Sequence, residues 1–286
     1  MPSFTIAQAL VEAAQILRKA GVPDSRRDAA TLLASIIGRD LTYLIAHADA
    51  ELSLSDASRL REFTERRAGG EPLQYVLGHQ DFYDLEFEVA PGVLIPRPET
   101  EILVEKTLSL IGQTKEPLIC DVGTGSGCII ISLLHDRPGA KGVALDISPA
   151  ALNIAKRNAD RLEVSNRLEL RQSDCFAAVT PNERFDFIVA NPPYVPEGAH
   201  GTLQREVRDH EPVEALVSGP DGLNMIRRLL RDAWDFVNPN GYFLFEMGFD
   251  QNEAVLALVS QSKWKLIEVL DDLQSIPRIV VLQKTA

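Results

Sequence analysis

Hydrophobic residues in the first 70 positions recur at helical spacing. After Thr5, whose side chain can form a capping box with Gln8, apolar residues follow three and four positions apart. A break at residues 21–23 ends this helix, and Gly38 ends the next one. Further helices are predicted over residues 24–37, 41–47 and 55–67. The pattern predicts a small helical bundle that carries no catalytic residues. Such a module usually recognises or positions a partner.

The pattern changes at residues 69–72, where two glycines and a proline mark the best domain boundary. Residues 82–89 alternate apolar and polar side chains, which predicts a β-hairpin. Pro98 suits the first turn of a helix that runs to about Ile111. The predicted division is a helical bundle at residues 1–70, a linker with the hairpin at 71–93, and a main domain at 94–286.

From residue 118 onward, β-favouring runs alternate with helical segments, which is typical of a parallel sheet with helices on both faces. The predicted strands are 118–122, 142–146, 168–172, 185–190, 242–247, 265–270 and 278–282, and the predicted helices are 127–135, 149–162, 222–236 and 251–261. The turn at 271–277 is too short for a parallel crossover, so the last strand should run antiparallel. The fold class is therefore α/β, a doubly wound seven-stranded Rossmann-like sheet with a small N-terminal helical bundle.

The composition, 45% hydrophobic and 24% charged over 286 residues, is that of an ordinary globular protein with room for two domains. No apolar run is long enough to span a membrane, and the N-terminus lacks the pattern of a signal peptide. Cys120, Cys128 and Cys175 are odd in number and show no metal-ligand spacing. We therefore expect reduced thiols, no metal site and a cytoplasmic location.

The formal charge of −12 is concentrated in the later part of the chain. Residues 1–80 hold 9 Lys and Arg against 10 Asp and Glu, whereas residues 81–286 hold 20 against 31. A long polyanion is repelled by such a surface, and no run of Lys or Arg offsets the repulsion. The charge therefore argues against nucleic acid as the direct substrate.

A glycine-rich turn follows the first predicted strand of the main domain and leads into a helix. Its sequence is Asp121-Val-Gly-Thr-Gly-Ser-Gly127, in which the glycines let the backbone turn tightly and approach a ligand that a Cβ atom would keep away. The spacing differs from the Gly-x-Gly-x-x-Gly of dinucleotide-binding folds, which are the main alternative. The candidate ligand-binding residues of this turn are Gly123, Thr124, Gly125, Ser126 and Gly127.

The motif Asn191-Pro-Pro-Tyr194 ends the apolar strand predicted at 185–190. The prolines stop the strand and leave the Asn191 side chain at its carboxyl end, where open α/β sheets bind ligands. The Asn191 carboxamide oxygen and the Pro192 carbonyl could accept both hydrogens of a planar –NH2 group, while the Tyr194 ring packs on its face. Taken alone, the motif could also be only a stiff turn.

Two acidic residues complete the pattern. Asp146 ends the second strand of the main domain, where a carboxylate can accept hydrogen bonds from ribose hydroxyls. Asp174 follows the third strand, where a carboxylate could take a hydrogen of an adenine amino group. The glycine turn, the two acids and the Asn-Pro-Pro-Tyr motif, in this order, indicate S-adenosylmethionine as the ligand, with a dinucleotide or an inactive fold as alternatives.

These segments resemble the PrmC/HemK methyltransferases over nearly the whole chain. Besides the glycine turn, Asp146 and the Asn-Pro-Pro-Tyr motif, the resemblance depends on residues 71–75 with Gly78, Leu94-Ile-Pro-Arg-Pro-Glu-Thr-Glu101, 211–212, 221–223 and 276–278. The motif Pro-Arg-Pro-Glu-Thr-Glu distinguishes the chain from the sister family that methylates a glutamine of a ribosomal protein. One departure is Cys175, which stands where the family often has an aromatic residue near the adenine, so stacking is weaker or passes to Phe176.

The resemblance implies an S-adenosylmethionine-dependent enzyme that methylates N5 of the glutamine in the Gly-Gly-Gln loop of class-1 peptide chain release factors and leaves S-adenosylhomocysteine. The implied residues are Asn191, Pro192 and Tyr194 for catalysis; the glycine turn, Asp146, Asp174, Cys175 and Asn191 for the cofactor; and Asn191, Pro192, Pro193, Tyr194, Leu94 and Arg97 for the substrate. The release factor would be engaged by the helical bundle. We expect a monomer that binds neither nucleic acid nor membrane.

Three alternatives belong to other classes. An N6-adenine nucleic-acid methyltransferase needs the same pair of acceptors and the same stacking ring, but it should also carry a basic strand-binding surface. A binding protein that kept the fold without turnover, and a dehydrogenase, fit the glycine turn and the Asn-Pro-Pro-Tyr motif less well. Glu246, near the end of the strand predicted at 242–247, is expected to be structural.

Overall fold

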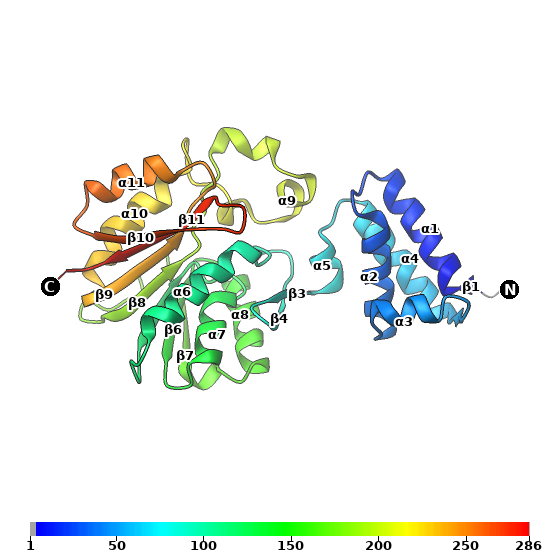
Figure 1. The fold of residues 1–286 in the computed structure, drawn as a ribbon, viewed down its shortest axis with the longest axis horizontal. Helices are drawn as coiled ribbons and strands as arrows, with labels where there is room; N and C mark the ends of the chain where they lie inside the picture. The colour runs from blue at the N-terminus through cyan, green and yellow to red at the C-terminus, as the bar shows by residue number, and fades with distance from the viewer. Residues whose placement is uncertain (1–3, 286) are drawn as a thin grey trace. The chain divides into compact units, whose positions relative to one another are not determined.

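The computed structural model describes residues 4–285 and divides the chain into two compact units (Figure 1). The first unit contains the residues up to Gly78 together with Gln204–His210, and the second contains His79–Leu203 and the residues from Glu211 onward. Within residues 4–285, no helix combines the length and the apolar character that crossing a membrane requires.

The first unit is a helical bundle, as predicted. Its elements are β1 (Phe4–Thr5), α1 (Ile6–Lys19), α2 (Ser25–Ile37), α3 (Leu41–Ala46), β2 (Glu51–Leu52), α4 (Leu54–Ala68), α5 (Leu73–Leu77) and α9 (Arg205–His210). The capping box at the start of α1 is confirmed, because the Thr5 side chain accepts from the backbone of Gln8 while the Gln8 side chain accepts from that of Thr5. Gly38 ends α2 in the left-handed conformation.

The first unit runs past the predicted boundary at residue 70. Helix α5, which the sequence pattern did not predict, packs against α2 and α4 and buries Tyr75 and Val76. The apolar side chain of Val76 joins Leu17, Leu32 and Leu33 in one core. The finer division into functional domains 1–70, 71–93 and 94–286 stays a prediction.

A second unpredicted helix, α9, is held in the first unit by charged side chains from a distant part of the sequence. Arg67 is 8% exposed, and it pairs with Asp28 over 2.8 Å and with Glu206 of α9 over 2.6 Å. Arg205 of α9 donates a hydrogen bond to the backbone carbonyl of Gly69. These contacts explain why residues 204–210 belong to the same compact unit as the N-terminal helices.

The second unit contains the predicted seven-stranded sheet. Its strands are β5 (Leu118–Val122), β6 (Lys141–Asp146), β7 (Leu168–Gln172), β8 (Phe185–Ala190), β9 (Val237–Glu246), β10 (Lys265–Asp271) and β11 (Pro277–Gln283), in the spatial order β10-β11-β9-β8-β5-β6-β7. Strand β11 runs antiparallel to both of its neighbours, so the prediction for the last strand is confirmed. The strands β5 to β9 are parallel.

Helices cover both faces of this sheet, as expected for a doubly wound fold (Figure 1). Their bounds are α6 (Glu101–Ile111), α7 (Cys128–Asp136), α8 (Pro149–Arg161), α10 (Asn224–Asp232) and α11 (Asn252–Ser260). Along β5, Ile119 faces the core beneath α6 and α7, whereas Cys120 faces the core beneath α10 and α11. All three cysteines are buried and free, in agreement with the prediction of reduced thiols.

The predicted hairpin is present, but its first strand begins before the alternating segment 82–89 from which it was predicted. Strands β3 (His79–Phe82) and β4 (Leu85–Glu88) pair antiparallel, and both residues of the turn, Tyr83 and Asp84, have positive φ angles. Beyond the hairpin, Pro98–Thr100 forms a single 3-10 turn (η1) that leads into α6. This turn brings Thr100 to the edge of the sheet where the predicted site residues gather.

Candidate functional site

The carboxyl ends of neighbouring parallel strands meet at one edge of the sheet. Strand β8 lies between β5 and β9, and its register pairs Val189 with Asp121 and Ala190 with Phe245. The glycine turn, the Asn-Pro-Pro-Tyr motif and the end of β9 therefore begin side by side. Open α/β sheets bind their ligands at this edge.

The glycine turn leaves open space on one side of its backbone. Gly123 and Gly125 have φ angles of +78° and +56°, and a Cβ atom added to either would meet no heavy atom within 4 Å. A Cβ atom on Gly127 would instead lie 2.6 Å from the Ile131 side chain. The first two glycines therefore open a path for a ligand to approach the backbone, whereas a side chain at Gly127 would force the Ile131 side chain of the following helix to move.

A buried carboxyl group precedes the turn. Asp121 is fully buried, and its Oδ2 accepts a hydrogen bond from the Thr124 hydroxyl over 2.7 Å. Its Oδ1 accepts none from any residue in the described chain. Burial, supported by the charge of Asp146, raises the pKa of Asp121 to about 7. The backbone N–H of Ile130, in the helix that follows the turn, lowers the pKa of this carboxyl, so the start of that helix contributes to its surroundings.

Asp146 ties the glycine turn to the start of the next helix. Its Oδ2 accepts from the backbone N–H of Gly125 over 2.8 Å, and its Oδ1 accepts from that of Ser148 over 2.9 Å. Burial raises the pKa of this carboxyl, while these hydrogen bonds oppose the shift. Each oxygen keeps a second lone pair, which is compatible with the predicted contact to ribose hydroxyls.

The residues after β7 differ from one another in their surroundings. Asp174 lies at the surface and pairs with Arg228 over 2.6 Å. Cys175 is buried with a φ angle of +49°, and its sulfur lies 3.4 Å from the sulfur of Met225. The Phe176 ring stacks on Phe236 within the core, so it is not free to take over stacking on an adenine. The roles of Asp174 and Cys175 in binding the cofactor stay predictions.

The Asn191 carboxamide lies directly after β8 and has two unequal ends. Its nitrogen donates a hydrogen bond to the Thr100 hydroxyl oxygen over 3.0 Å. Its oxygen is buried and accepts no hydrogen bond from any of residues 4–285. Pro192, the next residue, is buried, and Pro193 is half-buried. The structure thus presents an unused acceptor where the motif predicts one.

Tyr194 is connected to the same network. Its hydroxyl donates to Glu246 Oε1 over 3.2 Å, and Thr100 donates to Glu246 Oε2 over 2.6 Å. Burial raises the pKa of Tyr194, so the phenol keeps its proton. Burial also raises the pKa of Glu246, against the opposite effect of these two hydrogen bonds. The Tyr194 carbonyl oxygen accepts a hydrogen bond from the Gln251 side chain over 2.9 Å, and Gly222 lies so close to it that a Cβ atom there would come within 2.2 Å.

The segment before α6 is anchored by a second buried acid. The side chain of Glu211 is 1% exposed, and its two oxygens accept from Arg97 over 2.6 Å and from the Ile95 backbone over 3.3 Å. Leu94, the predicted substrate-lining residue next to this anchor, is half-buried. Arg97 is therefore fixed by an ion pair, and its role in lining the substrate site stays a prediction.

Comparison with known sequences identifies the family. Residues 8–78 match the PrmC N-terminal domain, and residues 98–210 match the methyltransferase small domain. The chain is 42% identical over 281 residues to the release factor glutamine methyltransferase of Koribacter versatilis, covering 98% of this chain and 99% of that one. This chain belongs to the release factor glutamine methyltransferase family. A relative of the same name from Moorella thermoacetica is 43% identical over 252 residues, 88% of each chain.

Solved structures agree on the fold. The catalytic domain of hMettl16, in complex with the MAT2A 3′UTR hairpin 6, aligns with 80% of this chain and 82% of its own at a TM-score of 0.57 and 17% identity. The 16S rRNA N2 G1207 methyltransferase RsmC of Thermus thermophilus aligns with 72% of this chain and 49% of its own at a TM-score of 0.52 and 19% identity. At these identities the likeness concerns the methyltransferase fold alone.

In this member of the release factor glutamine methyltransferase family, the sequence pattern assigned no site role to three buried acids and one hydroxyl that the structure places at or beside the site. They are Asp121, Glu211, Glu246 and Thr100. Glu246 was expected to be structural, and Thr100 lay within the segment that carried the resemblance without a role of its own. A charged residue near the end of an otherwise apolar strand is the pattern that could have pointed to Asp121 and Glu246. Such residues are rarely buried unless they have a partner or belong to a functional site.

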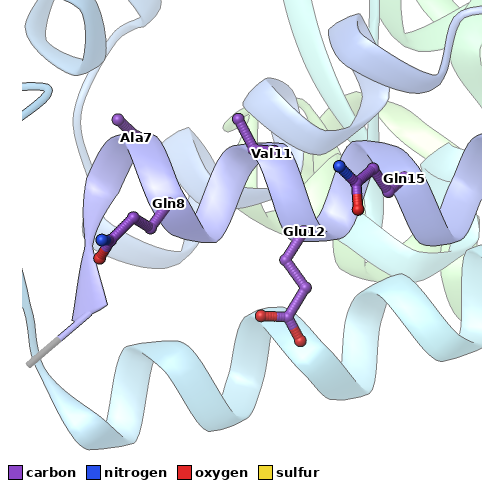
Figure 2. A pocket seen from close by; sticks show the side chains of 5 residues that line it. All are labelled: Ala7, Gln8, Val11, Glu12 and Gln15. Carbon is purple, nitrogen blue, oxygen red and sulfur yellow. The ribbon is translucent and has the colours of Figure 1, made fainter. Parts of the chain in front are cut away.

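A hollow elsewhere on the protein does not involve these residues. It is a shallow, open area on the surface of α1 in the helical unit, formed by side chains that project from this one helix (Figure 2): Ala7, Gln8, Val11, Glu12 and Gln15. Within the described residues, no group of three His, Cys, Asp or Glu side chains is arranged to hold a metal ion.

Proposed function

We propose that this protein transfers a methyl group from S-adenosylmethionine to the side-chain amide nitrogen of the glutamine in the Gly-Gly-Gln loop of class-1 peptide chain release factors, leaving S-adenosylhomocysteine. The observation that carries the proposal is the buried Asn191 oxygen, which lacks a hydrogen-bond donor at the carboxyl edge of the sheet. Membership of the release factor glutamine methyltransferase family supports the choice of substrate.

The residues around the glycine turn fit the cofactor. The open space beside Gly123 and Gly125 lets a ligand approach the backbone of the turn, and Asp146 keeps lone pairs that can accept from ribose hydroxyls. S-adenosylmethionine supplies an activated methyl group on a sulfonium sulfur, whose departure as a neutral thioether needs no acid. The residues proposed to hold it are Gly123, Thr124, Gly125, Ser126, Gly127, Asp146, Asp174, Cys175 and Asn191.

The protein's own contribution is orientation and electrostatics. An amide nitrogen is a weak nucleophile, because its lone pair is delocalised into the carbonyl group. Asn191 Oδ1 and the Pro192 carbonyl would accept its two hydrogens, which raises the electron density on nitrogen and aims it at the methyl carbon. The new N–C bond forms as the S–C bond breaks, and the nitrogen then loses one of these hydrogens as a proton to water, which leaves a secondary amide and a neutral thioether. Tyr194, with its hydroxyl held by Glu246, would pack on the plane of the amide.

The protein substrate would be held by more than the reacting amide. Leu94, Arg97 and Pro193 are proposed to line the substrate site, and the helical unit is proposed to engage the body of the release factor. Because Arg97 is paired with Glu211, we expect it to shape the site rather than to attract an anion. The monomeric state and the cytoplasmic location stay predictions.

Two other methyl acceptors would use the same residues. An adenine N6 amino group also presents two hydrogens to Asn191 and Pro192 and a flat face to Tyr194. The charge of −12 disfavours a nucleic-acid substrate. The other alternative acceptor is the glutamine of a ribosomal protein. Its side-chain amide is chemically the same as that of the release factor glutamine, and only the protein that carries it differs.

Transfer of a labelled methyl group distinguishes these acceptors. Purified release factor should be labelled, whereas its variant with Gln→Ala in the Gly-Gly-Gln loop, a ribosomal-protein fraction and DNA should not. Label on DNA or on the ribosomal fraction, but not on the release factor, would overturn the proposal.

A further inference from the structure

The Asn191 carboxamide is the last member of a chain of buried polar groups that begins at Glu246. Glu246 Oε2 accepts from the Thr100 hydroxyl over 2.6 Å, and the Thr100 oxygen accepts from the Asn191 nitrogen over 3.0 Å. Thr100 and Glu246 are each 1% exposed, so water cannot readily replace either contact. The three residues come from the start of α6, the loop after β8 and the end of β9.

The direction of each hydrogen bond in this chain is fixed by chemistry. The hydrogen bonds from Thr100 and Tyr194 and the charge of Arg278 favour the ionised form of Glu246, against the effect of burial. In that form the carboxylate can only accept hydrogen bonds, and a hydroxyl has a single hydrogen to donate. The Thr100 hydroxyl donates that hydrogen to Glu246, so it can only accept from Asn191. The –NH2 end of Asn191 must then face Thr100, and the oxygen must face the opposite way.

We infer that Thr100 and Glu246 are positioning residues, which determine that Asn191 offers its oxygen rather than its nitrogen to the methyl-accepting amide. The inference rests on the proposed function, since it concerns how the same amide is recognised. A carboxamide turned by 180° has nearly the same shape, so packing alone does not select between its two orientations. In the turned form, the –NH2 group of Asn191 would face the –NH2 group of the methyl-accepting amide. Asn191 would then offer no oxygen to accept a hydrogen of that amide.

Glu246 also fixes the second recognition group. The Tyr194 hydroxyl donates to Glu246 Oε1, the oxygen that Thr100 does not use. One buried carboxylate therefore orients both the acceptor of the amide hydrogens and the ring proposed to pack on the amide plane. The two hydrogen bonds satisfy both oxygens of a carboxyl group at the end of an apolar strand, where burial alone disfavours its charge.

Hydrogen exchange at the Asn191 side chain tests the orientation without any methyl acceptor. In 15N-labelled protein, the relevant pair of protons is the one that is missing from the spectrum of Asn191→Ala. Thr100→Val removes the hydroxyl at nearly constant volume and should speed exchange by about tenfold or more, because a buried hydrogen bond protects its proton. Thr100→Ser should keep the protection, and equal exchange in the two variants would overturn the inference. If the valine variant does not fold, Thr100→Ala removes the same hydroxyl.

Turnover provides the second readout. Thr100→Val should lower kcat about 10- to 100-fold, as is typical for residues that orient a reacting group, with little change in the affinity for S-adenosylmethionine. Thr100→Ser should restore most of the rate. Thr107→Val is the matched control, because it removes a fully buried hydroxyl of the adjoining helix α6 that donates to the Leu103 carbonyl.

A double-mutant cycle separates positioning from folding. When Asn191 is already replaced by Ala, Thr100→Val should lower kcat only slightly, because the group that it positions is absent. A loss of the same size with and without Asn191 would overturn the inference. If the wild-type protein methylates no release factor, the proposed function fails, and the exchange measurement still decides whether Thr100 fixes the carboxamide.

Discussion

The backbone N–H of Gly125 donates a hydrogen bond to Asp146 Oδ2 over 2.8 Å. The turn after β5 is thus held in shape by the carboxylate at the end of the neighbouring strand β6. The other oxygen of Asp146 accepts from Ser148, the N-cap of α8, so one side chain links the glycine turn, a strand end and a helix start. A residue proposed to bind ribose therefore also shapes the loop proposed to surround the rest of the cofactor.

Asp146→Ala is expected to weaken the binding of S-adenosylmethionine about 10- to 100-fold, because both the contact and the shape of the turn are lost. Calorimetric titration of the donor measures this effect, and kcat at saturating donor should fall less. Asp136→Asn, an exposed acid at the end of α7, is the control and should bind normally. Unchanged donor affinity in Asp146→Ala would show that the site lies elsewhere.

Asn191→Ala should lower kcat by about two to three orders of magnitude, as is typical when one preorganised group of a reaction centre is removed, while donor affinity changes little. Methyl transfer to the release factor and calorimetry measure the two quantities separately. Asn191→Asp should not restore the rate, since a carboxylate cannot donate to Thr100. Asn238→Ala, which removes a carboxamide bonded to Asp186, is the control. Comparable losses of rate and donor affinity in Asn191→Ala would mean that Asn191 mainly builds the cofactor pocket.

Much of the fold could be predicted, because local rules decide it. The alternation of apolar strands and amphipathic helices gave the doubly wound sheet, and the short turn before β11 gave its antiparallel direction. The capping box at Thr5 and the hairpin at residues 79–88 likewise depend on neighbours in the sequence. Helix α9 could not be assigned to the helical unit, since its ion pair from Glu206 reaches Arg67, far away in the chain.

The site was predictable only in part, because some of its contacts join residues that are far apart in the sequence. The glycine turn and the Asn-Pro-Pro-Tyr motif are each continuous in sequence, so the ligand contacts that they can make are predicted from their residue types. Thr100 meets Asn191 across 91 positions and Glu246 across 146, and no local pattern reports such a contact. The unused oxygen of Asn191 became visible only with these partners in place.

Two glycines of the turn should respond differently to the same substitution. Gly123→Ala places a methyl group in open space, so it should weaken donor binding with a stability loss of only about 1–2 kcal/mol from the left-handed backbone. Gly127→Ala places the methyl group 2.6 Å from the Ile131 side chain, so it should lower the melting temperature clearly more. Calorimetric titration and thermal unfolding measure the two effects. Equal melting temperatures in the two variants would contradict the assigned packing role of Gly127.

The buried ion pair of Arg67 should stabilise the helical unit strongly. Arg67→Ala leaves Asp28 buried without its partner and frees Glu206 of α9, so we expect a loss of about 3–5 kcal/mol in the free energy of unfolding. Denaturant unfolding of the full chain measures this loss. Arg61→Ala is the control, because its pair with Glu12 spans 3.7 Å and is exposed, and it should cost under about 1 kcal/mol. A loss equally small in Arg67→Ala would contradict the role of this ion pair.

The buried carboxyl of Asp121 should make the stability of the cofactor-free protein depend on pH. Burial and the nearby Asp146 raise the pKa of Asp121 to about 7 in the folded chain, whereas an unfolded aspartate releases its proton near pH 4. Between these values the folded state binds the additional proton, so the contribution of Asp121 to the free energy of unfolding decreases as the pH rises from about 5 to about 7.

Asp121→Asn removes this titration and keeps the size and polarity of the side chain. The difference in melting temperature between this variant and the wild type should therefore shift in favour of the variant as the pH rises from about 5 to about 7, and stay constant above that range. Asp186→Asn is a suitable comparison, because Asp186 lies at the opposite end of the sheet, where it accepts from the Leu118 backbone and from Asn238. A difference for Asp121→Asn that is independent of pH would mean that Asp121 is already ionised in the folded protein. The unpaired oxygen would then carry a full negative charge before any cofactor binds.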